Sequence, residues 1–220
     1  MDSASADPAG AWPRRGSPPR RRRRGRILFA IGAALIAASL AIGSYLGWQL
    51  WGTGLATQRW QSQLRKGFEK QIDTQVATPT AGSADPRVVL PGQAVAILQI
   101  PRIGLDMVVV EGTGIEDLKK GPGHYTDTAY PWQDHGRVGI AGHRTTYLHP
   151  FFHLDQVRPG DRIILQTRYG TYDYEVTRVF VTLPDDGSVL EQTRRPTLVL
   201  TTCEPRYSAS HRLIVDAVRT

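Results

Sequence analysis

The feature that most constrains the fold of this chain is an uninterrupted apolar segment near its start. Residues 27–47, ILFAIGAALIAASLAIGSYLG, contain no charged side chain in 21 residues. As a helix rising about 1.5 Å per residue, the segment would be about 32 Å long, enough to cross the hydrocarbon core of a bilayer. A cleaved signal peptide is the alternative, but its apolar region is usually about 7–15 residues long and ends at a small-x-small site. We therefore expect one uncleaved transmembrane helix at 27–47.

The residues before this segment are strongly basic. Residues 1–26 hold eight arginines against Asp2 and Asp7, which accounts for +6 of the formal net charge of +7. Their Pro, Gly, Ser and Arg content predicts a disordered tail. Because only neutral residues follow at 48–58, the positive-inside rule places the tail in the cytoplasm and the remaining chain outside. The later residues show no basic stripe interleaved with aromatics, so no nucleic-acid partner is expected.

Residues 48–92 are expected to form an extracytoplasmic stalk and linker. Apolar residues recur every four positions at Trp60, Leu64, Phe68 and Ile72, a spacing that predicts a helix over 55–72. The segment that follows is rich in Thr, Pro, Ala and Gly, a composition typical of linkers.

From residue 93 onward the pattern changes to short β-rich runs separated by Gly, Pro and Asp turns. Such a pattern predicts an all-β barrel or sandwich over 93–220, with one short helix in IEDLKKGPGH. The expected strands lie at 93–100, 106–112, 137–143, 161–167, 171–183, 197–203 and 212–218.

The chain has a single cysteine, Cys203, at the end of the run LVLTTC. One cysteine excludes an internal disulfide, and a buried apolar filler is the simplest interpretation of such a residue. Two observations favour a reactive thiol instead. An idle exposed thiol outside the cytoplasm is open to oxidation, and Pro205 places Cys203 at a strand end, because proline cannot donate to a strand ladder.

A thiol nucleophile needs a proton partner and a group that stabilises an oxyanion. His143 also ends a β-rich run, VGIAGH, although a lone histidine is more often structural. Arg212 opens the run after the 204–211 loop, which would place it at the same end of the sheet as Cys203; a surface arginine is the alternative. A zinc site at His143, His149 and His153 is disfavoured, since there is no HExxH motif and no second cysteine.

These residues occur in an order that resembles the sortases, membrane-anchored cysteine transpeptidases of Gram-positive bacteria. The resemblance covers about residues 90–220. It rests on GPGHY (121–125), IAGHRTTY (140–147), PFFHLD (150–155), PGD (159–161), LTTC (200–203) and an arginine nine residues after the cysteine. Valine at 199 replaces the first threonine of the usual T-L-x-T-C signature.

The resemblance implies an eight-stranded β-barrel with short helices and an active-site groove beside the seventh and eighth strands. It assigns Cys203 as nucleophile, His143 as proton donor and acceptor, and Arg212 as stabiliser of substrate and oxyanion. Thr202 would help to shape the site. The segment 182–196 would line the pocket for the substrate, with contacts at Leu183, Val189 and Leu190.

The implied reaction cleaves a sorting signal of the L-P-x-T-G or L-A-x-T-G type between Thr and Gly. A thioacyl intermediate on Cys203 then passes to an amine of lipid II or of the peptidoglycan cross-bridge. The implied partners are secreted proteins with a C-terminal sorting signal, and no metal or organic cofactor is required. The single N-terminal anchor, the TTCEPRYSASHR loop and the lack of a second apolar segment resemble class E rather than class C sortases.

Two other functions remain open from the residues alone. The first is a wall-associated cysteine hydrolase or protease that uses the same dyad with water as acceptor. The second is a membrane-tethered β-barrel that binds a partner without catalysis, in which case Cys203 could be replaced without loss of function.

Overall fold

The apolar segment near the start of the chain forms one long helix, α1 (Arg21–Gly47). Its part from Gly25 to Gly47 is long and apolar enough to cross a membrane, and none of that span is buried within the protein. The helix begins at Arg21, six residues before the expected start, because arginine is a good helix former and extends the helix of the apolar segment.

The computed structural model describes residues 21–48, 52–73, 89–90 and 92–220. They divide into two compact units, Met1–Tyr45 and Leu46–Thr220. Residues 1–20 of the expected tail and nearly all of the expected linker at 73–92 lie outside the described residues.

The second unit begins with helix α2 (Thr53–Asp73), which contains the predicted helical stripe. Phe68 is 2% exposed and packs with Leu64 and Ile72 against two side chains of the barrel, Ile97 and Val108. Trp60, the first residue of the stripe, remains 47% exposed. The helix therefore docks on the barrel and belongs to the same compact unit.

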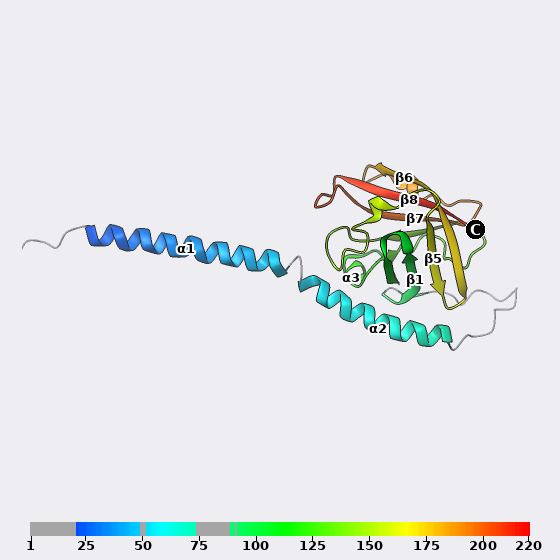
Figure 1. Cartoon of the computed structure of the whole chain (residues 1–220), viewed down its shortest axis with the longest axis horizontal. Helices are drawn as coiled ribbons and strands as arrows, with labels where there is room; N and C mark the ends of the chain where they lie inside the picture. Colours follow the sequence, from blue (N-terminus) through cyan, green and yellow to red (C-terminus); the bar gives the residue numbers. More distant parts are fainter. Residues whose placement is uncertain (1–20, 49–51, 74–88, 91) are drawn as a thin grey trace, which may run out of the picture. The chain divides into compact units, whose positions relative to one another are not determined.

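Eight strands close the expected barrel (Figure 1). Around the barrel they follow the order β1-β2-β3-β4-β7-β8-β6-β5, and β5 pairs with β1 to complete the circle. The pairs β2–β3 and β4–β7 are parallel and the others are antiparallel. The strands are β1 (Ala94–Ile100), β2 (Leu105–Glu111), β3 (Gly123–His124), β4 (Arg137–Ala141), β5 (Arg162–Thr167), β6 (Gly170–Thr182), β7 (Thr197–Glu204) and β8 (His211–Arg219).

All seven β-rich runs of the sequence become strands, and the short helix expected in IEDLKKGPGH is α3 (Ile115–Leu118). The eighth strand, β3, was not among the seven runs because it has only two residues. Three 3-10 turns complete the unit: η2 (Pro101–Ile103), η3 (Leu154–Gln156) and η4 (Gly187–Leu190).

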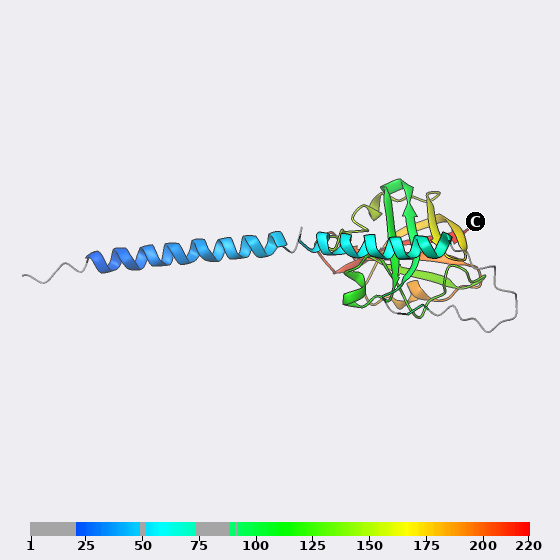
Figure 2. The ribbon, with the colours of Figure 1, turned by 90° about the horizontal axis from the view of Figure 1, so that it is seen from below.

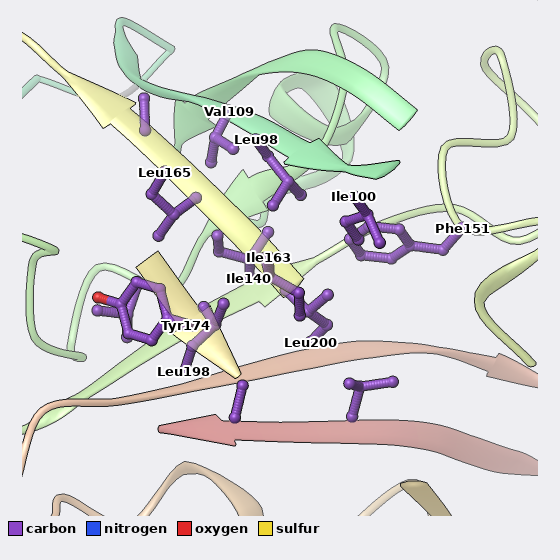
Figure 3. Close-up of a cluster of buried hydrophobic side chains, with 14 of the residues drawn as sticks. Leu98, Ile100, Val109, Ile140, Phe151, Ile163, Leu165, Tyr174, Leu198 and Leu200 are labelled. Carbon is purple, nitrogen blue, oxygen red and sulfur yellow. The ribbon is translucent and has the colours of Figure 1, made fainter. Parts of the chain in front are cut away.

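Alternate residues of the strands point into the barrel and form one core (Figure 3). Side chains from every strand except the two-residue β3 meet there, and Phe151, from the loop after β4, packs among them. On β7 the inward residues include Leu198 and Leu200, both fully buried. The alternate residues, Val199, Thr201 and Cys203, therefore face outward.

Helix α2 packs on β1 and β2, which stand across the closed barrel from β7 and β8 (Figures 1 and 2). Gln61 fixes the helix to the edge of β2. The Gln61 amide donates to the carbonyls of Val108 and Lys120 at 2.9 and 2.8 Å and accepts from the Val108 N–H at 2.8 Å. The helix leaves the outer face of β7 and β8 uncovered.

Candidate active site

Cys203 and Arg212 form a cross-strand pair at one end of the antiparallel β7–β8 ladder. Directly opposite residues of such a pair have Cβ atoms about 4.5–5.5 Å apart. Arg212 is in turn opposite Thr182 of β6. A row of side chains therefore runs across three neighbouring strands on the outer face of the barrel.

His143 lies at the same end of the sheet as this row. Strand β4 runs parallel to β7 with Ala141 opposite Thr201, and the N–H of Gly142 donates to the Thr201 carbonyl at 3.1 Å. His143 comes two residues after Ala141, the last paired residue of β4, just as Cys203 comes two residues after Thr201. The two residues therefore lie at the same end of neighbouring strands.

The backbone around His143 is fixed on both sides. The His143 carbonyl accepts a hydrogen bond from the N–H of Phe151 at 3.1 Å. A Cβ on the preceding residue, Gly142, would lie 2.5 Å from the Phe151 ring, so this position has room only for glycine. The core residue Phe151 thus holds the strand end that carries His143.

The imidazole of His143 is half-buried and packs against Tyr147, with ring centroids 4.9 Å apart. Burial lowers the pKa of His143 below its ordinary value of 6.5, because the charged imidazolium loses hydration. The neutral imidazole is therefore the dominant form at neutral pH. A neutral imidazole can accept a proton from a thiol.

The guanidinium of Arg212 is oriented by the backbone of its own loop. Its Nη1 donates to the carbonyls of Ala209 and His211 at 3.1 and 3.0 Å. Both bonds use the same guanidinium nitrogen, Nη1. Arg212 also lines a pocket next to Cys203. A fixed cation at this position suits the stabilisation of a negatively charged oxygen.

The pocket next to Arg212 has a volume of about 210 Å³. The loop between β6 and β7 forms one wall and the outer faces of β7 and β8 form another. Tyr125 contributes a hydroxyl that lies 3.0 Å from the Thr201 hydroxyl. The lining residues are Tyr125, Thr182, Leu183, Pro184, Asp185, Asp186, Gly187, Val189, Leu190, Thr201, Arg212 and Ile214.

The pocket loop is held by its own polar residues. The Asp186 carboxylate accepts from the hydroxyls of Thr182 and Ser188, both at 2.5 Å. These hydrogen bonds, first that from Ser188 and then that from Thr182, lower the pKa of Asp186. Arg137 of β4 donates to the Val189 carbonyl at 2.6 Å. The pocket wall is thus built before any ligand arrives.

The structure places most of the sequence-predicted site residues together. Leu183, Val189 and Leu190 line the pocket together with Arg212, the residue opposite Cys203, and His143 lies beyond the end of β4 at the same end of the sheet. Thr202 differs, because the strand alternation turns its side chain inward. It is 3% exposed, and its hydroxyl donates to the Gly142 carbonyl at 2.7 Å. Thr202 therefore supports the His143 segment and is not a pocket residue.

Sequence reasoning missed several pocket residues, notably Tyr125 and Asp186. Tyr125 is the last residue of the motif GPGHY, so the sequence did mark this position. Its contact with Thr201 could not be foreseen, because 76 positions separate the two residues in the chain. Asp186 lies within the segment 182–196 that was expected to line the pocket, but nothing in the sequence distinguished it from its neighbours.

The other histidines near the site have different contacts. His149 packs on Phe152 with ring centroids 5.3 Å apart, and His153 Nδ1 lies 2.9 Å from the Gln156 amide nitrogen. His124 is buried between the Glu111 carboxylate, at 2.9 Å, and the Ala129 carbonyl, at 3.0 Å. Among the described residues no cluster of three or more His, Cys, Asp or Glu side chains is arranged to hold a metal ion.

Comparison with known proteins identifies the family. The model of the sortase domain matches residues 98–220, more than half of the chain. The chain belongs to the sortase family. Sortase D of Bacillus subtilis (strain 168) is 34% identical over 181 residues, which cover 78% of this chain and 86% of that protein.

Solved sortase structures share the fold. A Clostridium perfringens sortase D5 transpeptidase superposes with a TM-score of 0.60 at 28% identity, covering 74% of this chain and 97% of that one. Sortase E1 from Streptomyces coelicolor, solved with a tripeptide in the active site, gives a TM-score of 0.55 at 31% identity, covering 60% and 91%. The chain spans 55% of the full sequence of that S. coelicolor protein, SrtE1.

Sortases are cysteine transpeptidases of the cell envelope. This sortase is therefore an enzyme of that type, with a closed eight-stranded barrel and an N-terminal helix suited to membrane anchoring. Sortases as a family act on proteins that bear sorting signals and on amines of cell-wall precursors.

Proposed function

We propose that this sortase cleaves a sorting signal of the L-A-x-T-G or L-P-x-T-G type between Thr and Gly and joins the threonine carboxyl to an amine of the cell-wall precursor. The observation that carries the proposal is the Cys203–Arg212 pair of β7 and β8, with His143 just beyond the end of the neighbouring strand β4. Family membership adds weight, because a cysteine transpeptidase with a single cysteine has only Cys203 as a candidate nucleophile.

The first half of the proposed reaction forms a thioester. His143, neutral because burial lowers its pKa, takes the proton of the Cys203 thiol. The sulfur attacks the threonine carbonyl carbon, and Arg212 donates hydrogen bonds to the oxyanion that develops. When the C–N bond breaks, His143 returns the proton to the departing glycine amine. The threonine acyl group then remains on Cys203.

The second half transfers the acyl group. An acceptor amine attacks the thioester carbon while His143 accepts a proton from the amine. The oxyanion again lies beside Arg212, and it collapses with release of the sulfur, which is reprotonated by His143. The product is an amide between the signal threonine and the acceptor, and the enzyme returns to its starting state.

The pocket of about 210 Å³ is the proposed binding site for the signal upstream of the scissile bond. Arg212, the residue opposite Cys203, is one of its lining residues, so a peptide seated there would lie next to the proposed nucleophile. The related sortase E1 was solved with a tripeptide in its active site, which supports a site of this size for a short peptide.

We further propose that the catalytic unit faces the outside of the cell. Arg26 and the arginines before it flank one end of the apolar helix, whereas neutral residues follow the other end, and this asymmetry favours a cytoplasmic N-terminus. The acceptor would then be the amine of lipid II or of the peptidoglycan cross-bridge, and the donors would be secreted proteins that carry the signal.

The class of the enzyme is part of the proposal. The relatives include proteins named sortase D and proteins named sortase E. We assign this chain to class E on its cysteine-to-arginine loop, and that class accepts L-A-x-T-G signals. A preference for L-A-x-T-G over L-P-x-T-G peptides is the expected property.

One experiment separates transpeptidation from hydrolysis. The full chain in detergent micelles is incubated with L-A-x-T-G or L-P-x-T-G peptide and a glycine amine, and the products are separated by mass. The proposal expects the amide product to exceed the free acid at saturating amine. Exclusive formation of the free acid would show a cysteine hydrolase instead, and no cleavage of either peptide would overturn the assigned substrate.

A further inference from the structure

Arg144, the residue after His143, is a buried cation next to the proposed active site. It is 3% exposed. Its Nη2 lies 3.3 Å from the Asp155 carboxylate and 3.4 Å from the Glu204 carboxylate. Its Nε and Nη1 have no hydrogen-bond partner among the described residues. A buried guanidinium with unpaired N–H groups is costly, so its presence calls for an explanation beyond packing.

A second arginine extends the group into a four-residue charge network. Arg206 Nη2 lies 3.0 and 2.9 Å from the two carboxylate oxygens of Asp155, and its guanidinium lies 4.3 Å from the centre of the Phe152 ring. The network of Arg144, Asp155, Glu204 and Arg206 connects the loop after β4 with the end of β7. It therefore joins the segment that carries His143 to the segment that carries Cys203.

The position of Glu204 gives the network a chemical consequence. Glu204 directly follows Cys203 in β7, and its side chain is 26% exposed. An unpaired carboxylate at this position would repel a thiolate on its neighbour, since like charges disfavour each other's ionisation. The ion pair with Arg144 compensates the Glu204 charge.

The pKa of Arg144 reflects the charges around it. Burial lowers the pKa of Arg144, while Asp155, Glu204 and, more weakly, a charge on Cys203 oppose that change. The positive charge of Arg206 lowers the pKa of Arg144. The charged or titratable groups around Arg144 are therefore Asp155, Glu204, Arg206 and Cys203.

We propose that Arg144 is a positioning residue for Cys203: its buried charge holds Glu204 in an ion pair and keeps a positive charge beside the thiolate. The proposal rests on the proposed function, in which Cys203 reacts as a thiolate. In the proposed reaction Arg212 donates to the oxyanion, whereas Arg144 acts through Glu204, the neighbour of the nucleophile.

The test measures the thiolate directly and uses no peptide. Cys203 is the only cysteine, so the rate at which iodoacetamide alkylates the full chain in detergent micelles reports this thiol alone. The pH midpoint of the alkylation rate is compared among variants. Arg144→Met keeps most of the side-chain length without the charge and should raise the midpoint by about one pH unit. Arg144→Lys keeps the charge and should remain close to the wild type.

Glu204→Gln provides an independent arm that leaves Arg144 in place. Removing the negative charge next to the thiol should lower the midpoint, and the double variant Arg144→Met with Glu204→Gln should return towards the wild-type value. If Arg144→Met does not fold, the pH midpoint of Cys203 alkylation in Glu204→Gln is the measurement that tests the proposal. An unchanged midpoint in Glu204→Gln, or equal midpoints in Arg144→Met and the wild type, would overturn the proposal.

A matched control separates this effect from the general loss of an arginine. Arg162 of β5 is exposed and pairs with Asp173 at 2.7 Å, so Arg162→Met removes one cation and one ion pair away from the site. Its midpoint should equal that of the wild type. Peptide turnover in Cys203→Ala is measured separately: turnover there would refute the proposed function, while the alkylation midpoints would still test Arg144.

Discussion

Cys203 at the end of β7 stands directly opposite Arg212 at the start of β8. The antiparallel register therefore brings a thiol and a permanent cation together although nine positions separate them in the chain. A loop of only a few residues connects them, so the pairing is local and does not depend on the distant parts of the barrel. This pair is the basis of the proposed oxyanion stabilisation.

Replacing Arg212 with lysine tests whether the planar guanidinium group is needed for the proposed oxyanion stabilisation. Lysine keeps the charge but cannot donate to two backbone carbonyls and an oxyanion in one fixed geometry. We expect kcat/KM to fall roughly 10²–10³-fold, with a change in the free energy of unfolding below about 1 kcal/mol. Peptide kinetics and urea denaturation measure the two quantities. Near-wild-type kcat/KM would remove Arg212 from the mechanism.

The titration of His143 has a predicted direction. Because burial lowers its pKa, NMR titration of the Cys203→Ala variant, in which no thiol titrates, should give a His143 midpoint below 6.5. The unfolded chain then binds more protons in the window just below pH 6.5. The contribution of His143 to stability is accordingly complete above pH 6.5 and is lost as the pH falls towards the folded pKa. A midpoint above 6.5 would contradict the buried, neutral imidazole.

Gln61 should matter for stability and not for chemistry. Its amide makes three hydrogen bonds to Val108 and Lys120, across the barrel from the site. We expect Gln61→Ala to lower the free energy of unfolding by about 1–3 kcal/mol, since it leaves backbone groups of β2 unpaired. The exposed Gln58 on the same helix provides the control, because Gln58→Ala should be close to neutral. Equal unfolding curves for the two variants would show that α2 does not brace β2.

Gly139 of β4 lies under the pocket wall and gives a test of the peptide site. A Cβ there would lie 2.9 Å from Tyr125 and 3.1 Å from Leu190, two residues that line the pocket. Gly139→Ala must therefore displace side chains of the pocket without touching Cys203. We expect the KM for signal peptide to rise several-fold while the pH midpoint of Cys203 alkylation stays unchanged. A shift of that midpoint would show that the effect reaches the nucleophile.

The sequence predicted the strands well because each is a β-rich run bounded by turn residues. The exception, β3, has two residues and exists only because Gly123 and His124 fit between β2 and β4. Such a short strand leaves no periodic pattern. The helix over 55–72 was also predictable from its apolar stripe, but its packing on β1 and β2 required the folded barrel.

The site was predictable to the extent that its residues lie at strand ends. Cys203, His143 and Arg212 each end or begin a β-rich run, and the sheet register then pairs Cys203 with Arg212 and leaves His143 at the same end of the sheet. Arg144 was not predictable, because nothing in the sequence shows that a residue between His143 and an exposed loop is buried against Glu204. Thr202 was expected to help shape the site, but its inward direction and its hydrogen bond to the Gly142 carbonyl could be seen only in the folded sheet.

The most direct test of the central claim is the mass of the full chain after brief reaction with an L-A-x-T-G peptide in the absence of added amine. The account predicts one adduct equal to the peptide acyl group up to its threonine, located on Cys203 by peptide mapping and absent from Cys203→Ala. It also predicts that a glycine amine discharges this adduct to the amide product. Peptide cleavage by Cys203→Ala, or an adduct on another residue, would contradict the assignment of Cys203 as the nucleophile.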